Sequence, residues 1–377
     1  MVHTLQHDML ARRQSDDLSR QRFVLAFKRY VEGSLRPRNR AVYDRAAEPH
    51  YRARNGRPPA TRDEAQEALL AEQAYQTFSA LKSCSQEMLW QSVSECIHRD
   101  EDRLRETARH LRQANTRKGS LELDPNFATP RDMKRADIHG QPRGYVHCKD
   151  DEDVLAGALY EMGGNIYSMG RGMGGEDSKA GAAMAYLRKT YPDFAPTLIL
   201  DIGCSAGASS VPYAQSYPDA EVHAIDVGEA MLRYAHARAE ALGYPVHFHL
   251  RSADDTKFDD STFDLVVSHN IMHEISHEVR RGMLRETFRI LKPGGIAIHQ
   301  DVMIRYQGWD IFEQAERSWD LRFNTGPFWD LYGDGEILKD ARAAGFAPGS
   351  VNEIDLQKIS GPGAWYALVA RKGAPVD

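Results

Sequence analysis

The sequence predicts an α/β fold in which a mostly parallel sheet follows a mainly helical N-terminal region. Three observations support this prediction. From residue 178 onward, short apolar runs alternate with helical stretches, as they do in β-α-β units with right-handed crossovers. Between residues 61 and 113, apolar side chains recur at a helical period. The last two apolar runs, 351–356 and 365–370, predict a closing pair of strands.

The strands and helices of the C-terminal part follow from these runs in order. The expected strands cover residues 198–201, 221–226, 246–250, 263–268, 295–301, 351–356 and 365–370. The expected helices cover residues 180–190, a segment from about 209, 228–242, a segment from 269 through 291, and 335–344. Pro293 ends the fourth of these helices, and the two glycines after it make the turn into the fifth strand. We therefore expect seven strands.

The first 60 residues are rich in arginine and contain one short predicted helix, over residues 23–31. Most of the arginines lie within residues 36–57, and two interpretations of them stay open. A basic run is suited to an acidic ligand or RNA. The lack of an accompanying aromatic platform favours a solvated or subunit-facing arm.

A helix-breaking run, Asn55-Gly-Arg-Pro-Pro59, separates this arm from a helical segment. Thr61 and Glu64 form a capping-box pattern, and the sequence then predicts helix to about residue 113. One apolar face recurs at four-residue spacing, at Leu89, Val93 and Ile97. We expect this segment to be a helical cap or a dimerisation module, and the chain to form a homodimer.

Glycine is concentrated in residues 163–177, directly after a predicted helix over 153–162. Such a stretch loses much conformational entropy when it is ordered, so we expect a hinge or lid there, with a plain linker as the alternative. The predicted organisation is a mainly helical N-terminal region over 1–162, this linker or lid, and a C-terminal domain over 178–377. The C-terminal domain carries an aromatic-rich insertion at about 302–332.

Composition and charge limit the class of protein. The chain has 377 residues, a length for two domains or for one domain with a long extension. Its formal net charge of -6 gives no global basic field for nucleic acid or anionic membrane. Four scattered cysteines are typical of a reducing cytosol. There is no apolar signal core and no run of membrane-spanning length, so we expect a cytoplasmic protein without nucleic-acid or membrane partners.

The most informative stretch is Leu198-Ile-Leu-Asp-Ile-Gly-Cys-Ser-Ala-Gly207. An apolar strand ends at Asp201, and Gly203 and Gly207 allow a sharp turn and the close approach of a ligand. A strand, a loop of small residues and a helix start are the elements of nucleotide recognition in a doubly wound sheet. The pattern is neither G-x-G-x-x-G nor a P-loop, and a carboxylate in front of the loop repels phosphates. It therefore favours a cationic or hydroxyl-rich ligand.

This stretch resembles motif I of class I S-adenosylmethionine (SAM)-dependent methyltransferases, with Ser205 in place of the middle glycine. Three further elements follow in the family's order: Asp226 at the end of the second strand, Ala253-Asp254 after the third, and Leu291-Lys-Pro-Gly-Gly295 before the fifth. The resemblance covers the C-terminal half of the chain. It implies a Rossmann-like, seven-stranded methyltransferase sheet that closes with an antiparallel hairpin, and SAM as the cofactor.

The resemblance also implies roles for residues around the loop. Asp226 is expected to accept hydrogen bonds from both ribose hydroxyls, with a helix N-cap as the alternative role. Val227 and Met231 are expected against the adenine face, and Ala253-Asp254 at the adenine edge. Asp201 is expected to hold the glycine loop and the cationic amino-acid end of SAM. The expected cofactor-binding residues are Asp201, Gly203, Cys204, Ser205, Gly207, Asp226, Val227, Met231, Ala253, Asp254 and Ser268.

The fourth strand is followed by His269-Asn-Ile-Met-His-Glu-Ile-Ser-His277. Residues beyond the carboxyl ends of the strands face the ligand crevice, so His269, Asn270 and His273 are expected near the methyl group. Ile271-Met-His-Glu274 resembles the Leu-His-Asp stretch of small-molecule O-methyltransferases that have helical N-terminal dimerisation domains. That resemblance implies that His273 is the general base and that Glu274 orients it, with His269 as a further catalytic candidate. A structural or substrate-shaping role for His273 is the alternative.

The same run contains a literal H-E-x-x-H, the zinc-protease pattern, at His273-Glu-Ile-Ser-His277. With His269 it gives three histidines at helical spacing, which on a helix could share one face and bind zinc. Because the run lies between two strands of an apparent methyltransferase domain, we predict no metal ligand here. A metal-assisted methyltransferase, in which Asp301 or His299 joins the histidines, stays open.

The insertion at 302–332 is dense in aromatic side chains and suggests a lid or pocket for an apolar substrate. These residues are Trp309, Phe312, Trp319, Phe323, Phe328, Trp329 and Tyr332. Packing against the N-terminal helices is the alternative. Glu313 and Glu316 are candidates for polar substrate contacts.

These patterns together predict an enzyme that transfers a methyl group from SAM to a small molecule, with a hydroxyl oxygen as the favoured acceptor and His273 as the base. A carbon or nitrogen acceptor, methylated by proximity without a histidine base, is one alternative. A SAM-binding regulatory subunit without enzymatic activity is another. The acidic net charge and the lack of an Asn/Asp-Pro-Pro-Tyr/Phe motif argue against a nucleic-acid substrate.

Overall fold

An eight-stranded sheet forms the centre of the protein in a computed structural model that describes residues 5–135, 137–170, 179–359 and 363–373. The strands are β1 (Ser120–Glu122), β2 (Leu198–Ile202), β3 (Glu221–Asp226), β4 (His247–Leu250), β5 (Phe263–His269), β6 (Leu291–Asp301), β7 (Val351–Gln357) and β8 (Ala364–Arg371). Their order is β1-β4-β3-β2-β5-β6-β8-β7. β1 to β6 pair in parallel, while β8 is antiparallel to both β6 and β7. The predicted α/β architecture and closing hairpin are confirmed.

The predicted count of seven strands is wrong by one, because β1 adds an eighth strand from the N-terminal region. Leu121 pairs with Phe248 of β4, and the Ser120 N–H donates to the Val246 carbonyl at 3.3 Å. The chain reaches this edge through Gly119, where an added Cβ would lie 2.1 Å from the Val246 oxygen. Three residues are too few to establish a period-2 pattern, so the sequence carried no signal for this strand.

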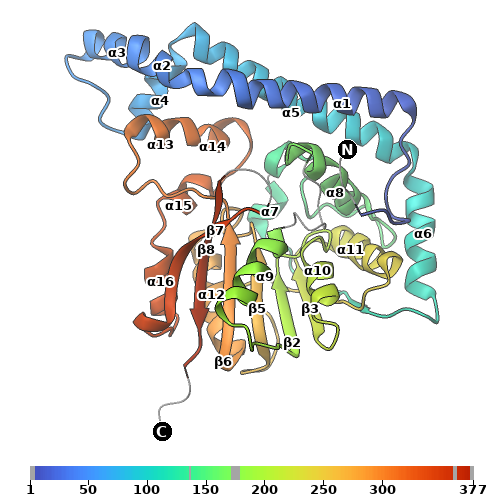
Figure 1. Cartoon of the computed structure of the whole chain (residues 1–377). Coiled ribbons are helices and arrows are strands. Elements are labelled where there is room, and N and C mark those ends of the chain that lie inside the picture. Colours follow the sequence, from blue (N-terminus) through green and yellow to red (C-terminus); the bar gives the residue numbers. More distant parts are fainter. Residues whose placement is uncertain (1–4, 136, 171–178, 360–362, 374–377) are drawn as a thin grey trace.

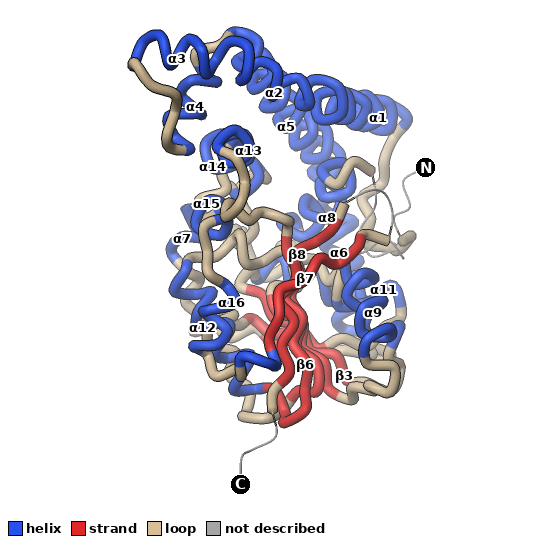
Figure 2. Tube along the Cα trace, turned by 60° about the vertical axis from the view of Figure 1, so that its left-hand side comes forward, coloured by secondary structure: helices blue, strands red, loops and turns tan. Residues whose placement is uncertain are grey.

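Helices cover both faces of the sheet (Figure 2). On one face lie α9 (Lys179–Thr190), α10 (Ser210–Ser216) and α11 (Glu229–Leu242), and on the other lie α12 (His277–Ile290) and α16 (Ile337–Ala343). The strand order reverses between β2 and β5, and in open α/β sheets the crevice at such a switch point receives the ligand. The candidate site is therefore expected beyond the carboxyl ends of these strands.

The N-terminal helices lie across this carboxyl edge, where α1 (Ser15–Tyr30) and α5 (Gln73–Arg99) pack side by side (Figure 1). The single helix predicted from 61 to 113 is instead three helices, because the chain turns sharply between them. They are α4 (Arg62–Leu70), α5 and α6 (Glu101–Gln113). Thr61 does cap α4, since its hydroxyl accepts from the Glu64 N–H at 3.2 Å.

Two glycines, Gly157 and Gly163, serve close packing. Helix α8 (Leu155–Tyr167) includes the first five residues of the segment 163–177 that was expected to be a linker or lid. An added Cβ on Gly163 would lie 2.3 Å from the Trp90 ring, and one on Gly157 would lie 2.3 Å from Tyr234. Glycine therefore lets α8 approach α5 and α11. Residues 171–178, with the rest of the expected lid, lie outside the described residues.

Gly163→Ala is expected to destabilise the protein, by about 1–2 kcal/mol, although alanine is the better helix former. The reason is that Trp90 is held in place by a 2.8 Å hydrogen bond from its Nε1 to the His139 carbonyl, so its ring resists displacement. Gly33→Ala is the matched control, because nothing lies within 4 Å of a Cβ there. Urea unfolding measures both variants. Equal stability of the two would contradict the packing role of Gly163.

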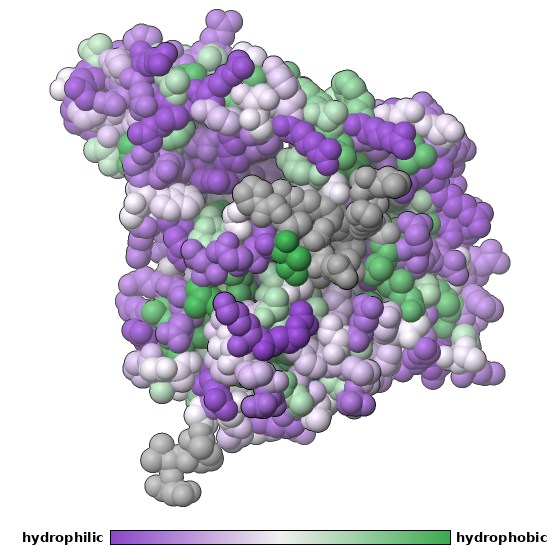
Figure 3. Space-filling view, in the orientation of Figure 1, coloured by the Kyte–Doolittle hydropathy of each residue, from purple (hydrophilic) through white to green (hydrophobic). Residues whose placement is uncertain are grey.

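Four arginines of the arm pair with carboxylates, and two of these carboxylates belong to the insertion. Arg36 Nε lies 2.8 Å from Glu316, and Arg40 contacts Asp310. The exposed part of the arm, over α2 (Asn39–Val42) and α3 (Glu48–Asn55), forms a hydrophilic corner of the molecule (Figure 3). Glu316 thus pairs with Arg36, and its role as a substrate contact stays a prediction. These pairs favour the interpretation of the arm as a structural surface.

The insertion folds into three short helices, α13 (Ile311–Arg317), α14 (Trp319–Phe323) and α15 (Trp329–Gly333). Trp319 is buried against N-terminal helices, and its Nε1 donates to Ser79 Oγ at 2.8 Å. Packing against the N-terminal helices thus explains Trp319, whereas Phe328 lines the pocket described below.

All four cysteines are free thiols. Among the described residues, no helix combines the length and apolar character needed to cross a membrane.

Candidate active site: a cofactor pocket beside a buried histidine–glutamate cluster

A pocket opens at the carboxyl edge of the sheet and encloses about 870 Å³ of empty space, part of it continuous with solvent. Both halves of the chain contribute to its wall. The described lining residues are Pro130, Asp132, Met133, Tyr145, Tyr160, Gly203, Ser205, Ile225, Asp226, Val227, Met231, Arg251, Ser252, Ala253, Asn270, Ile271, Glu274, Ile275, Ser276, Val279 and Phe328. The lining combines apolar side chains with a few polar groups, as is typical of small-molecule and cofactor sites.

The glycine loop after β2 forms one side of the pocket. Gly203, Ser205 and Gly207 all have positive φ angles, of 72°, 48° and 72°. At Gly203 an added Cβ would also lie 2.6 Å from the Ile271 side chain, so both the backbone conformation and the space demand glycine. Ser205 adopts the left-handed conformation that the family's glycine would take without strain.

Asp226 lies at the end of β3, lines the pocket and anchors the loop. Its carboxylate accepts from the backbone N–H groups of Ser205 at 2.9 Å, Val227 at 2.8 Å and Gly228 at 3.0 Å. Burial raises the pKa of Asp226, and the three N–H donors oppose that shift. The side chain therefore brings an acceptor-rich group to the pocket wall, in the position expected for a ribose contact.

Asp201 is fully buried and holds the loop to the start of α10. Its Oδ2 accepts from Ser209 Oγ at 2.6 Å and from Ser210 Oγ at 2.7 Å. Burial raises the pKa of Asp201 to about 6. Because Asp201 is not among the described lining residues, its predicted contact with the cationic end of SAM stays a prediction.

The other expected cofactor residues divide into two groups. Val227, Met231 and Ala253 line the pocket together with Gly203, Ser205 and Asp226. Four more are absent from the described lining: Cys204, Gly207, Asp254 and Ser268. Ser268, for example, faces the core of the sheet, where its hydroxyl lies 2.9 Å from His299 Nδ1.

The contribution of the N-terminal region to the pocket was not predicted from the sequence. Tyr145 and Tyr160 line it, and their rings meet edge to face at a centroid distance of 5.4 Å. Tyr160 lies on α8, which was expected only to precede a linker. The aromatic spacing in residues 119–160 carried too little periodicity to assign a face, so no local signal identified these residues.

His269 ends β5, residues 270–276 form an irregular turn, and the predicted helix from 269 begins only at His277. Asn270 has a φ of 61°, which breaks the helical path, and Ser276 caps α12. His269, His273 and His277 therefore do not share a helical face. His269 Nε2 lies 3.2 Å from the Tyr213 hydroxyl, and His277 Nε2 lies 2.9 Å from the Leu331 carbonyl.

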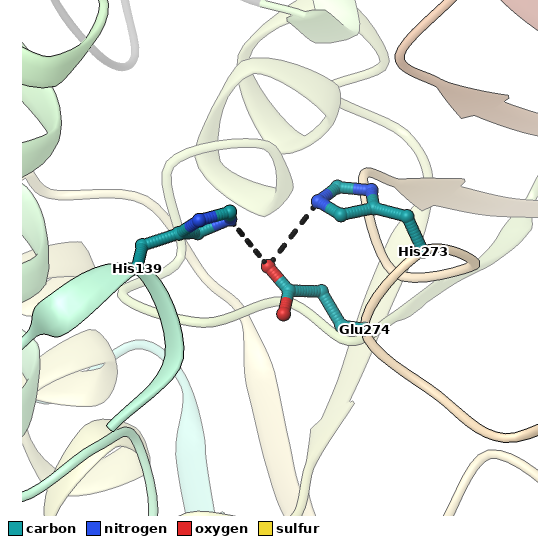
Figure 4. A group of neighbouring side chains, drawn as sticks. All are labelled: His139, His273 and Glu274. Carbon is teal, nitrogen blue, oxygen red and sulfur yellow. Dashed lines mark ion pairs between the residues drawn. The ribbon is translucent and has the colours of Figure 1, made fainter. Parts of the chain in front are cut away.

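His273 instead meets Glu274 and a histidine from the N-terminal region, His139 (Figure 4). Glu274 Oε1 lies 3.0 Å from His139 Nε2 and 3.3 Å from His273 Nε2. We call these three residues the histidine–glutamate cluster. Glu274 lines the pocket, so the cluster borders it. His139 was missed because nothing in its local sequence indicates that the chain brings it to this edge.

His139 is held in an unusual backbone conformation. It lies in the short 3₁₀ turn Ile138–Gly140 with a φ of 56°. Its carbonyl accepts from Gln86 Nε2 at 2.7 Å and from Trp90 Nε1 at 2.8 Å, so α5 fixes the turn. A positive φ at a non-glycine residue is a strain that persists only where the surroundings impose it.

Both ring nitrogens of His273 face carboxylate oxygens. Nδ1 donates to Asp301 Oδ1 at 2.5 Å, and Nε2 faces Glu274. Burial alone would lower the pKa of His273, but the two carboxylates outweigh it and raise the pKa to about 10. The same neighbourhood holds the pKa of Glu274 far below its ordinary value, because the two histidines outweigh its burial. The imidazole of His273 is thus paired with two carboxylates, and the carboxylate of Glu274 is paired with two imidazoles.

Comparison with known proteins finds a family match for one segment of the C-terminal half. Residues 199–295 match the profile of the methyltransferase domain family. A malonyl-[acyl-carrier protein] O-methyltransferase of Legionella pneumophila is 31% identical over 157 residues, which are 40% of this chain and 51% of the relative. A trans-aconitate 2-methyltransferase of Methylobacterium radiotolerans is 27% identical over 203 residues, 54% of this chain and 66% of the relative.

Among solved structures, an O-methyltransferase candidate from Nostoc punctiforme is 22% identical with a TM-score of 0.44, and the match covers 57% of this chain and 60% of that one. The chain spans less than two thirds of the length of the curated relatives named above.

Proposed function

We propose that this chain, which contains a class I SAM-dependent methyltransferase domain, transfers the methyl group of SAM to a hydroxyl oxygen of a small molecule. The observation that carries the proposal is the composition of one pocket. The glycine loop and Asp226 form one side of it, and Glu274 of the histidine–glutamate cluster belongs to the same wall. A nucleoside-binding side and an acceptor side are thus within one cavity.

The residues of the first side fit SAM. Asp226 has carboxylate oxygens for the ribose hydroxyls, and Val227 and Met231 offer an apolar surface to adenine. Gly203 lines the pocket, and its missing side chain makes room for Ile271, which lines the pocket beside it. When bound, SAM supplies an electrophilic methyl group for an in-line displacement. The protein has to align the acceptor oxygen with that group and exclude competing water.

The residues of the second side favour an oxygen acceptor. Glu274 is an ionised carboxylate on the pocket wall, so it can accept a hydrogen bond from a hydroxyl and orient it. To act as the general base, as predicted from the sequence, His273 would need a ring nitrogen with a free lone pair that faces the acceptor. Since Nδ1 faces Asp301 and Nε2 faces Glu274, we assign acceptor activation to the cluster as a unit. The O-methyltransferase relative from Legionella is in line with an oxygen acceptor.

The test is a methyl-transfer assay on the full chain with isotopically labelled SAM. Panels of phenols, hydroxy acids, carboxylic acids and amines serve as acceptors, and mass spectrometry of the products identifies the methylated atom. Transfer to a hydroxyl supports the proposal. Transfer only to nitrogen or carbon would replace the acceptor class, and SAM binding without any transfer would favour a regulatory subunit. Light scattering tests the predicted homodimer.

His273→Ala is expected to lower kcat by about 100-fold or more, while the Kd for SAM stays near the wild-type value. The reason is that His273 positions Glu274 but is not itself among the described residues that line the pocket. His277→Ala is the matched control from the same run, because its side chain contacts the Leu331 carbonyl instead. Steady-state kinetics and calorimetry measure the two effects. An unchanged kcat for His273→Ala would remove the cluster from the mechanism.

A further inference from the structure

We propose that His139, His273 and Glu274 bind a divalent first-row transition-metal ion. The ion would lie at the acceptor end of the pocket, because Glu274 is part of the pocket wall. Binding of the ion is independent of the proposed function, whereas its role in activating an acceptor hydroxyl rests on that function. The proposed site differs from the H-E-x-x-H interpretation, since it uses His139 and leaves out His277.

The spacing of the ligand atoms suits a coordination shell. One nitrogen from each histidine and one oxygen of Glu274 all lie within 4.8 Å of one another. The oxygen lies 3.0 Å from His139 Nε2 and 3.3 Å from His273 Nε2. An ion with bonds of about 2.0–2.2 Å to nitrogen and oxygen holds neighbouring ligand atoms about 3 Å apart. The polar ends of the three side chains point toward one another (Figure 4), so only small movements would bring them around an ion.

The groups behind the ligands have the arrangement found at metal sites. A histidine ligand commonly donates its second N–H to a carboxylate or another acceptor, which fixes its tautomer and orientation. His273 Nδ1 donates to Asp301, and Asp301 is itself held by the N–H groups of Met272 and Val302, at 2.8 and 2.6 Å. His139 Nδ1 lies 3.0 Å from Asn324 Nδ2 and 3.2 Å from the Tyr167 hydroxyl, and in the tautomer that leaves Nε2 free for the ion the Tyr167 oxygen is the acceptor for its N–H.

The donor set selects the class of ion. Two imidazoles and one carboxylate are typical of catalytic zinc and non-haem iron(II), and three protein ligands leave positions open. Magnesium and calcium prefer sets made of oxygen, so they fit this cluster poorly. Trp329 packs edge-on against the His273 ring at 5.3 Å, whereas Glu274 borders the pocket. The open positions therefore face the cavity.

This placement gives the ion a chemical role in the proposed reaction. A hydroxyl oxygen that coordinates a divalent cation loses its proton more readily, because the cation stabilises the resulting oxyanion. The proton passes to solvent, the C–O bond forms as the C–S bond of SAM breaks, and the sulfur takes the electron pair. No proton acceptor on His273 is then required, since the ion would occupy the position of the proton on its Nε2.

The test measures metal binding directly on the full chain, after dialysis against a chelator. Co²⁺ is titrated in, and its visible absorption and the heat of binding are recorded, with Zn²⁺ and Mg²⁺ in parallel titrations. We expect one tightly bound Co²⁺ or Zn²⁺ per chain, a higher Tm in its presence, and no response to Mg²⁺. Co²⁺ binding that is as weak as in His139→Ala would overturn the proposal.

Variants separate this site from the neighbouring histidines. His139→Ala and Glu274→Gln are expected to abolish binding, and Asp301→Asn, which keeps all three ligands, should weaken it by about 10–100-fold. His277→Ala should bind like the wild type, and loss of binding in this variant would overturn the ligand assignment. Binding of SAM to each variant checks that it is folded, and Asp301→Asn keeps the proposal testable if a ligand variant does not fold.

Methyl transfer with and without the ion distinguishes the two proposals. If Co²⁺ or Zn²⁺ binds but no acceptor is methylated, the metal site stands and the proposed function fails. If transfer proceeds equally in chelator-treated protein, the role of the ion in activating the acceptor fails, the proposed function stands, and the Co²⁺ titration alone decides the metal site. If transfer is lost on chelation and returns with Zn²⁺ or Co²⁺, both are supported.

Discussion

Asp226→Ala is expected to weaken SAM binding by about 100-fold or more. Hydrogen bonds to a charged group contribute about 1.5–3 kcal/mol each, and the ribose offers two hydroxyls to this carboxylate. The substitution also releases the Ser205 N–H, which Asp226 holds at 2.9 Å, so the glycine loop loses an anchor. Both effects act on the bound state of the nucleoside.

Calorimetry with SAM and with its demethylated product measures the effect without any acceptor. Asp226→Asn keeps the shape of the side chain and is expected to lie between the wild type and Asp226→Ala. Glu221→Ala is the matched control, because Glu221 starts the same strand, β3, and is largely exposed at the opposite end. Wild-type affinity in Asp226→Ala would refute the ribose assignment and leave Asp226 as an anchor of the glycine loop and of the turn that leads into α11.

The parts of the structure that could be predicted are those that follow from local pattern. Short apolar runs bounded by polar residues and glycine predicted β2 to β8. The clearest of them are the central parallel strands β2 and β5, which are buried on both faces and therefore apolar over most of their length. The left-handed conformations of Gly203 and Gly207 could be predicted because a tight turn after a strand needs them. Asp226 could be placed because its position depends only on where β3 ends.

The parts that could not be predicted depend on tertiary contacts. His139 reaches the site because Gln86 and Trp90 of α5 bind its carbonyl, more than 40 residues away in sequence. Gly163 looked like part of a hinge, yet the ring of Trp90 occupies the space of its side chain. The three histidines from His269 had helical spacing, but the left-handed Asn270 separates them. In each case a distant partner or a single backbone angle decided the outcome.

The second large effect is expected in the buried junction between the two halves of the chain. Glu161 of α8 is only 1% exposed, and it accepts from Arg238 Nε at 2.9 Å and from the Tyr234 hydroxyl at 2.7 Å, both on α11. His7 Nε2 lies 3.1 Å from the same carboxylate. One carboxylate therefore joins the N-terminal segment, α8 and the sheet domain, and it neutralises a fully buried guanidinium.

Glu161→Ala is expected to lower the free energy of unfolding by about 3–5 kcal/mol, because it leaves Arg238 buried without its counter-charge. The double variant Glu161→Leu/Arg238→Met should recover most of that loss, since it removes both charges and keeps apolar volume. Asp16→Ala is the control, because its pair with Arg20 is exposed and contributes at most about 1 kcal/mol. Urea unfolding compares the variants, and equal losses for Asp16→Ala and Glu161→Ala would contradict the argument.

The pH dependence of unfolding supplies an independent check on Glu161. Burial would raise its pKa, but Arg238, His7 and Tyr234 outweigh burial and lower the pKa to about 2 from an ordinary 4.5. A carboxyl group whose pKa is lower in the folded state stabilises the fold above its unfolded pKa and loses that contribution as the pH falls toward its folded pKa. The stability advantage of the wild type over Glu161→Ala should therefore be full at pH 7 and shrink between about pH 4.5 and 2, by about 3 kcal/mol. The double variant lacks the carboxylate, so its unfolding free energy should lack this component of the acid dependence.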